Sequence, residues 1–368
     1  MKMKLVGRLI ALFILMIIIA SISELQAEEG LRPYKLINAD KLIISKIEDE
    51  YITNLFGNVH FFYGDTEFFC DKADIFELQK IVRMQGNVKV YDDTLSLKAD
   101  NVNYFRKSER LLLHGDVLAT ETHIDSTIRT FAADEVEYFR NSRELFAKEN
   151  VITYDERENM HGACGELNYF MNDGYGYLMK EPVLSIAKKD TISISAEKIE
   201  YFKDYKKVAA TFNVKTFSKD FIMTSDFLLY FADEEKAVYL GEPIFTSDMA
   251  DATAIEFRIF FEEQKIKKAI LQDSCYVMFS EVEDRPKKSW AVGDLMEFNF
   301  ENGNITFCEA KGNVNSHFQQ EPEESRDFSA NNAQGEHLII EMDEQNRIER
   351  ISMKDKVHGI YKFKHKKW

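Results

Sequence analysis

Hydrophobic and polar residues alternate along most of this chain with a period of two. Between residues 87 and 104 the apolar positions alternate with Asn, Lys, Ser and Asp, and they are Val88, Val90, Leu95, Leu97, Val102 and Tyr104. The same alternation recurs near residues 192–201 and 221–230. Such a pattern is typical of β-strands that have one dry face and one wet face. The pattern therefore predicts strands rather than helices.

The strands belong to a repeating unit. Gly57-Asn58-Val59 is followed 29 residues later by Gly86-Asn87-Val88, and again by Gly115-Asp116-Val117. Each copy continues through a small residue and an acid, such as Ala99-Asp100, to an aromatic pair such as Tyr104-Phe105. A period near 30 residues indicates units that bury their apolar faces only when they stack.

Short polar turns separate the strands, and they fit hairpins better than helical crossovers. Each unit is expected to form three or four strands of roughly five to seven residues. We therefore predict an all-β fold, an elongated and splayed antiparallel β-jelly roll of about ten units of roughly 30 residues. The usage of 29 Phe and 16 Tyr with 5 Pro agrees with this class.

Residues 1–27 differ from the rest of the chain. Lys2, Lys4 and Arg8 precede an apolar run from Leu9 to Ala20, and Ala27 lies at the expected cleavage site. This layout predicts a secretory signal peptide, with an uncleaved N-terminal anchor as the alternative.

The repeats predict a domain over residues 28–320, which could part into two subdomains near 245–290, where the copies are blurred. Residues 321–368 are expected to hold a divergent terminal repeat and a basic tail. The formal net charge of −16 disfavours nucleic acid and anionic membrane faces as partners.

The sequence contains no recognisable catalytic or metal-binding motif. The eight His are scattered, and no nucleophile elbow, phosphate-binding Gly loop or HExxH motif occurs. The repeated acids, such as Asp100 and Asp134, are expected to form hydrogen bonds in turns. Cys70, Cys164, Cys275 and Cys308 could pair in three ways, but their positions within the repeat differ, which favours free thiols. We predict no enzyme activity, no cofactor and no metal.

The inward positions carry many large apolar side chains. An open groove lined by them can hold extended lipid chains, at about 0.8 kcal/mol for each buried methylene. The predicted lipid-contacting residues are Val88, Val90, Leu95, Leu97, Val102, Tyr104, Ile192, Ile194, Ile199, Tyr201, Phe221, Met223 and Tyr230. The alternative is a structural or adhesive β-solenoid with a packed interior and no ligand.

These repeats resemble the OstA-like family, which includes the periplasmic lipopolysaccharide-transport protein LptA and the N-terminal domain of LptD. The resemblance rests on Gly86-Asn87-Val88 with Ala99-Asp100 and Tyr104-Phe105, and on further copies over residues 36–320. It implies a periplasmic lipid carrier or bridge that takes part in transport of lipopolysaccharide, or a related amphipathic lipid, to the outer membrane.

The resemblance also implies partners. Other Lpt-type β-jelly-roll proteins, or further copies of this chain end to end, would pair with the terminal strands near Leu36–Ile44 and Ile360–Phe363. The chain would be exported to the periplasm, with association to the inner or outer membrane open.

Overall fold

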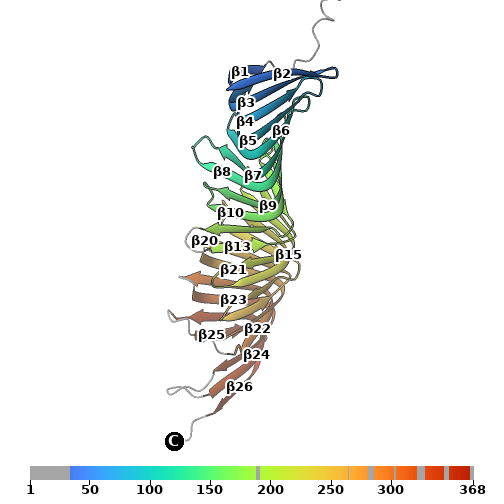
Figure 1. Ribbon diagram of the computed structural model, residues 1–368. Helices are drawn as coiled ribbons and strands as arrows, with labels where there is room; N and C mark the ends of the chain where they lie inside the picture. Colours follow the sequence, from blue (N-terminus) through green and yellow to red (C-terminus); the bar gives the residue numbers. More distant parts are fainter. Residues whose placement is uncertain are drawn as a thin grey trace, which may run out of the picture. The chain divides into compact units, whose positions relative to one another are not determined.

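The computed structural model describes residues 34–187, 191–263, 265–280, 286–301, 304–320, 328–343 and 348–364. These residues form 26 strands, and no helix occurs among them. Every pairing recorded between the strands is antiparallel. The predicted all-β, antiparallel class is confirmed (Figure 1). The signal peptide expected at residues 1–27 and the end of the basic tail lie outside the described residues.

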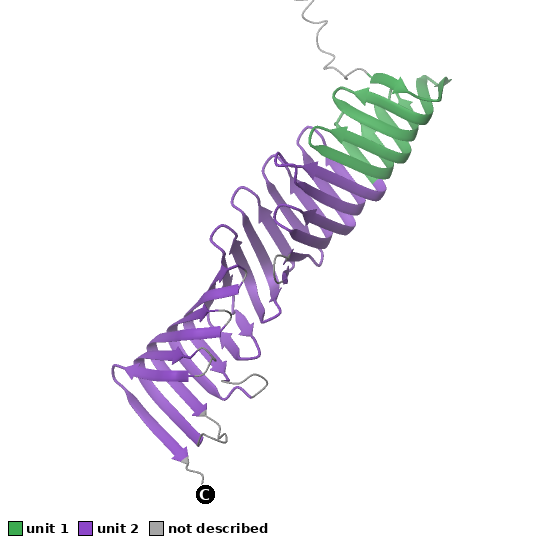
Figure 2. Cartoon of the chain, turned by 90° about the vertical axis from the view of Figure 1, so that its left-hand side faces the viewer, with its two compact units in different colours: residues 1–113 green, residues 114–368 purple. Residues whose placement is uncertain are grey.

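The chain divides into two compact units, residues 1–113 and 114–368 (Figure 2). In the first unit, β3 to β6 are consecutive antiparallel neighbours. The two ends of β3 pair with different strands, one with β1 and the other with β2. The strands of this unit are β1 (Tyr34–Asn38), β2 (Lys41–Ile47), β3 (Glu50–Tyr63), β4 (Thr66–Phe76), β5 (Ile81–Asp92) and β6 (Leu95–Phe105), and β7 (Arg110–Thr122) begins in it.

The second unit contains the remaining nineteen strands. They are β8 (Ile128–Phe139), β9 (Glu144–Asp155), β10 (Met160–Phe170), β11 (Tyr175–Met179), β12 (Val183–Ala187), β13 (Thr191–Ser195), β14 (Lys198–Phe202), β15 (Lys207–Phe217), β16 (Ile222–Phe231), β17 (Lys236–Leu240), β18 (Ile244–Thr246), β19 (Ala250–Thr253), β20 (Glu256–Glu262), β21 (Lys265–Phe279), β22 (Ser289–Glu301), β23 (Asn304–Gln320), β24 (Phe328–Met342), β25 (Ile348–Lys354) and β26 (His358–Lys364).

Two walls of strands make up the second unit, because the long strands pair with different neighbours at their two ends. One end of β10 pairs with β12 and the other with β11, and β15, β16, β21 and β24 divide in the same way. The first wall thus continues through β12, β13, β18, β19 and β26. The second wall continues through β11, β14, β17, β20 and β25. From β12 to β24, buried side chains between the walls form an apolar cluster.

The Gly-Asn-Val motif lies in the middle of a long strand, at the point where the strand bends. Gly57 and Asn58, and likewise Gly86 and Asn87, have consecutive positive φ angles of 72° and 44°, and 73° and 46°. The strand register shifts at each such pair, which identifies a β-bulge. Ten consecutive pairs with positive φ occur in the described parts of the chain, close to the expected number of repeats. Gly and Asn recur there because they tolerate the left-handed backbone.

Strands β3 to β6 of the first unit are longer than predicted, whereas β1 and β2 have 5 and 7 residues. β4, β5 and β6 have 11, 12 and 11 residues, not five to seven, because the strand continues through the bulge instead of ending there. The shorter length is correct for strands such as β13 and β14, which have 5 residues each. The bulge bends the strand without ending it, which the alternation alone did not reveal.

The repeated acids lie opposite the bulges and not in turns, which corrects the predicted place. Asn87 Nδ2 donates to Asp71 at 2.8 Å, and Asn150 Nδ2 donates to Asp134 at 2.6 Å. The backbone N–H of Asp226 donates to the carbonyl of the first bulge residue, Gly241, at 3.1 Å. Further Asn-to-acid hydrogen bonds of this kind join Asn58 to Asp40, Asn213 to Glu197 and Asn313 to Asp294.

The same geometry aligns one further copy of the repeat. The spacing of the small-residue and acid pairs in the sequence suggests Ala73-Asp74 as the counterpart of Ala99-Asp100, but the counterpart is Cys70-Asp71, because Asp71 lies opposite the bulge. Asp74 instead accepts a hydrogen bond from Asn54 at 2.7 Å.

Candidate functional site

The predicted lipid-contacting residues of the first unit meet in one packed interior. Val88, Val90, Leu95, Leu97, Val102 and Tyr104 all point inward and are at most 1% exposed. Aromatic rings fill the same space: Phe61 stacks on Phe68 at 4.9 Å between centroids, and Phe68 lies 5.4 Å from Tyr104. A ligand can reach these side chains only where the surrounding strands separate.

The predicted residues of the second unit share the cluster between the walls. Ile194, Ile199, Phe221 and Met223 are buried in it, and Tyr201 and Tyr230 pack against it half-buried. Ile192, two residues from Ile194 on the same face of β13, is half-buried. Burial raises the pKa of the Tyr201 and Tyr230 hydroxyls.

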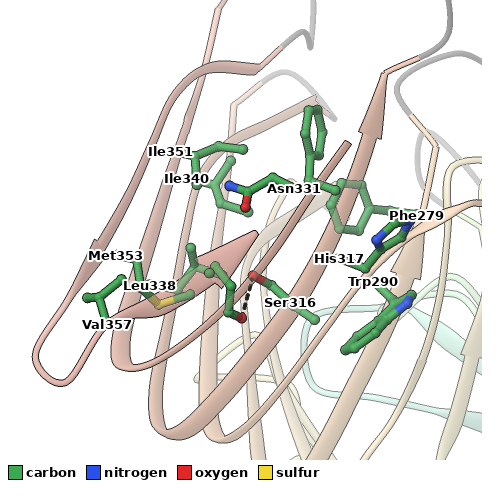
Figure 3. A pocket seen from close by; sticks show the side chains of 14 residues that line it. Phe279, Trp290, Ser316, His317, Asn331, Leu338, Ile340, Ile351, Met353 and Val357 are labelled. Carbon is green, nitrogen blue, oxygen red and sulfur yellow. Dashed lines mark hydrogen bonds between the residues drawn. The ribbon is translucent and has the colours of Figure 1, made fainter. Parts of the chain in front are cut away.

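A cleft of about 210 Å³ opens at the C-terminal part of this interior (Figure 3). Buried Leu338 and Ile340 belong both to the apolar cluster and to the lining of the cleft. In Figure 3, Leu338, Met353 and Val357 lie on one side of the cleft, and Trp290 and His317 lie on the other. Ser316 Oγ lies inside the cleft and donates a hydrogen bond to the Ala333 carbonyl oxygen at 3.4 Å.

The cleft is therefore continuous with the interior, but its lining is more polar than the deep cluster. Asn331 and Ser316 are polar residues that line the cleft. Trp290 contributes from the outer side, since its neighbours Ser289 and Ala291 take the buried positions of β22, and His317 lies opposite Trp290 on β23. The sequence did not predict this cleft. Its lining residues come from strands that are distant in the sequence, and the alternation within one strand does not show which strands face each other.

A buried ionic cluster interrupts the apolar lining in the second unit. Arg129 Nε donates to Asp155 at 2.8 Å, and Arg129 Nη1 donates to the Tyr169 hydroxyl at 2.6 Å. That hydroxyl donates to Glu121 at 3.2 Å, and burial raises the pKa of Tyr169. Arg129, Asp155 and Glu121 are 5%, 3% and 7% exposed. These three charged residues occupy inward positions of their strands, so a charge at an inward position is the sequence signal for the cluster.

An apolar cavity of about 50 Å³ adjoins this cluster. It is lined by Arg129, Tyr169 and Tyr201 together with Gly162 and Gly176. The volume is close to that of one or two water molecules, so the cavity holds no sizeable ligand as it stands.

The terminal strands are open edges. β1 and β2 pair only with β3, and β26 pairs only with β24, among the described residues. Both edges expose large apolar side chains, including Ile44 at 61% and Phe363 at 65%. Unpaired backbone groups beside exposed apolar side chains form a template for pairing with another strand.

The titratable residues do not assemble into a catalytic or metal centre within the described ranges. No group of three or more His, Cys, Asp or Glu there could hold a metal ion. His60 contacts Glu67 at 2.8 Å, and His114 contacts Glu135 at 3.3 Å, so these two have partners that the sequence did not reveal. Cys70, Cys164, Cys275 and Cys308 are free, as predicted.

No helix of the described residues is long and apolar enough to cross a membrane. The fold and interior define an all-β protein whose antiparallel repeats bend at bulges and enclose an apolar space. Residues 34–159 match the family model described as OstA-like protein, so the chain carries an OstA-like segment. The resemblance expected from the repeat is confirmed.

The solved structures similar to this chain include LptH from Pseudomonas aeruginosa, described as the LptA homologous periplasmic component of the conserved lipopolysaccharide transport device. The two are 12% identical, the match covers 49% of this chain and 83% of that chain, and the TM-score is 0.24. The comparison with curated proteins finds no match.

Proposed function

We propose that the protein is a periplasmic lipid carrier or bridge that shelters the acyl chains of lipopolysaccharide or a related amphipathic lipid. The observation that carries this proposal is the apolar interior of the second unit, which leads into an open cleft of about 210 Å³. The OstA-like match over residues 34–159 supports it. The role needs no catalytic step.

Acyl chains would enter at the cleft and advance toward Phe221, Met223, Ile194 and Ile199 as the walls part. Each methylene transferred from water contributes about 0.8 kcal/mol, which offsets the cost of separating the side chains that now touch. The predicted contacts from Val88 to Tyr230 remain part of this proposal. Because the first-unit residues are almost fully buried, we expect them to be reached last.

Lpt-type β-jelly-roll proteins are the proposed partners at the two open edges. β26 and the β1–β2 pair would each add a strand from a neighbour, which extends the apolar path from one molecule to the next. The proposed location is the periplasm, reached through the signal peptide at residues 1–27. The proposed division of the mature chain is 28–320 and 321–368.

Photocrosslinking in cells tests the lipid-binding role. A photoreactive amino acid at Ile351 in the cleft, and others at Ile194 and Leu97, should each form an adduct with lipid. The matched control is Thr224 on the outer side of β16, which should not. Adducts only to neighbouring protein at all three inner positions would contradict the proposal.

The second candidate function is a structural β-solenoid without a ligand. The stacked rings of Phe61, Phe68 and Tyr104, which leave the first-unit interior filled, favour it. The two candidates differ at Ile351, since a purely structural solenoid gives no lipid adduct even at the open cleft.

A further inference from the structure

The bulges divide the outer surface of the second unit into two parts of very different composition. On the first wall, Ile152 of β9 lies beside Ala163 of β10, and Ala163 lies beside Val183 of β12. This row of outward positions continues strand by strand from Ala132 on β8 to His358 on β26. We name this row and the parallel row from Thr130 to Ile360 the uncharged face.

The uncharged face lacks ionised side chains almost entirely. Of its 28 positions, only Lys215 and Asp251 are Asp, Glu, Lys or Arg. Asp251 is paired with Lys287 at 2.7 Å. The two corresponding rows of the second wall, from Glu135 to Lys354 and from Glu137 to Ser352, carry 12 such residues in 28 positions.

Large apolar side chains are exposed on the uncharged face. Ile152, Phe217 and Ile244 are 59%, 51% and 46% exposed, and Val183, Tyr276 and Ile360 are exposed as well. In the two rows of the second wall, Met179 and Leu295 are the only large apolar side chains that are exposed. An extended apolar patch of this kind on a soluble protein marks an interaction surface.

We propose that the uncharged face packs against the same face of a second copy of this chain. With a formal net charge of −16, two copies repel each other through most of their surface, and this face is where that repulsion is weakest. The same charge opposes docking on an anionic membrane. In the twofold arrangement described below, ten strands of each copy overlap. At about 4.8 Å per strand they form a strip of roughly 48 by 10 Å, which buries about 1,000 Å² in a dimer, the lower limit for a specific interface.

The distribution of side-chain size on the face is self-complementary. Phe217 and Ile222 lie side by side on β15 and β16, and Ser185 and Ser193 lie side by side on β12 and β13. A twofold axis parallel to the strands, between β13 and β15, places the two large residues of each copy over the two serines of the other. Sheets that pack face to face with aligned strands interdigitate in this way.

Sedimentation velocity on the full chain tests the proposal. Tyr361→Pro on the edge strand β26 serves as the background, because it removes end-to-end strand pairing and leaves the face intact. This variant should sediment as a dimer. Adding Phe217→Glu or Ile244→Glu should weaken the dimer at least 100-fold, and adding Leu295→Glu on the second wall should leave it unchanged. Circular dichroism confirms that each variant is folded.

Cysteine crosslinking tests the arrangement itself. When Ser193→Cys and Phe217→Cys proteins are mixed and oxidised, a disulfide-linked pair containing one of each should form. A monomeric Tyr361→Pro protein at 100 µM would overturn the proposal, as would Phe217→Glu and Ile244→Glu proteins that remain dimeric. Binding of the wild type to neutral phosphatidylcholine vesicles in place of self-association would also overturn it.

Discussion

The bulge residues show why the repeat motif has its particular composition. Two consecutive residues with positive φ are needed in each repeat, and side chains with a Cβ are strained there. Gly86 also leaves room for the Asp71 carboxylate, since a Cβ at Gly86 would lie 2.4 Å from Asp71 Oδ2. Phe212 departs from this rule, with a φ of 60° and 61% exposure.

The bulge geometry predicts substitution effects of opposite sign. Gly86→Ala should lower the free energy of unfolding by about 1–3 kcal/mol, because it adds backbone strain and a clash with Asp71. Phe212→Gly should raise it by about 1 kcal/mol, because it relieves strain. Urea denaturation measures both. Equal stability of the wild type and Gly86→Ala proteins would show that the bulge conformation is not what selects glycine.

The Arg129 cluster predicts a second pair of effects at single residues. Arg129→Met should destabilise the second unit by about 3–5 kcal/mol, because Asp155 and Glu121 would remain as buried charges without their cation. The triple variant Glu121→Leu, Arg129→Met, Asp155→Leu is the control, and it should be more stable than Arg129→Met alone. If urea denaturation showed the triple variant to be less stable than Arg129→Met, the cluster would stabilise the fold by packing alone.

At the scale of the elements, β1, β2, β25 and β26 each pair with a single neighbouring strand among the described residues, so each leaves one edge open. Tyr361→Pro on β26 should remove end-to-end association of the protein, since proline cannot donate the hydrogen bond that a new strand needs. Light scattering over a range of protein concentrations measures this loss. Tyr205→Ser, at an exposed turn residue, is the control and should associate like the wild type. If the Tyr361→Pro protein assembled like the wild type, the contact between molecules would lie at a site other than the edge of β26.

At the scale of the whole molecule, burial of thiols and phenols predicts alkaline sensitivity. Burial raises the pKa of Cys70 and Cys308 from 9.0 to about 12, and that of Tyr239 from 10.0 to about 12. Their folded pKa values are raised, so the stabilisation is complete below about pH 9 and is lost as the pH rises toward 12. The free energy of unfolding should therefore fall between pH 9 and 12.

Urea denaturation at pH 8, 10 and 11 measures the alkaline loss. The double variant Cys70→Ala, Cys308→Ala should lose less stability over this range than the wild type. Identical pH dependence of the two proteins would assign the loss to other groups.

The period-two pattern was enough to predict the β class and the inward face of each strand, and the spacing of the Gly-Asn-Val motif gave the approximate number of repeats. Leu97 and Ile194 show why: alternation fixes which side chains share a face, whatever the neighbours are. Asp71 shows the limit, since its partner Asn87 is opposite it across the bulge and could be assigned only from the register. The cleft near Ile351 was missed for the same reason.

Local patterning therefore decides the strands, their buried faces and the OstA-like repeat, because a residue's preference for a dry or wet side is an intrinsic property. Pairing between strands decides the rest. The bulges send the two ends of each long strand into different walls, and only then do scattered residues such as Ile152, Phe217 and Ile244 become one uncharged face. The open cleft and the buried Arg129 cluster likewise exist only where strands distant in sequence meet.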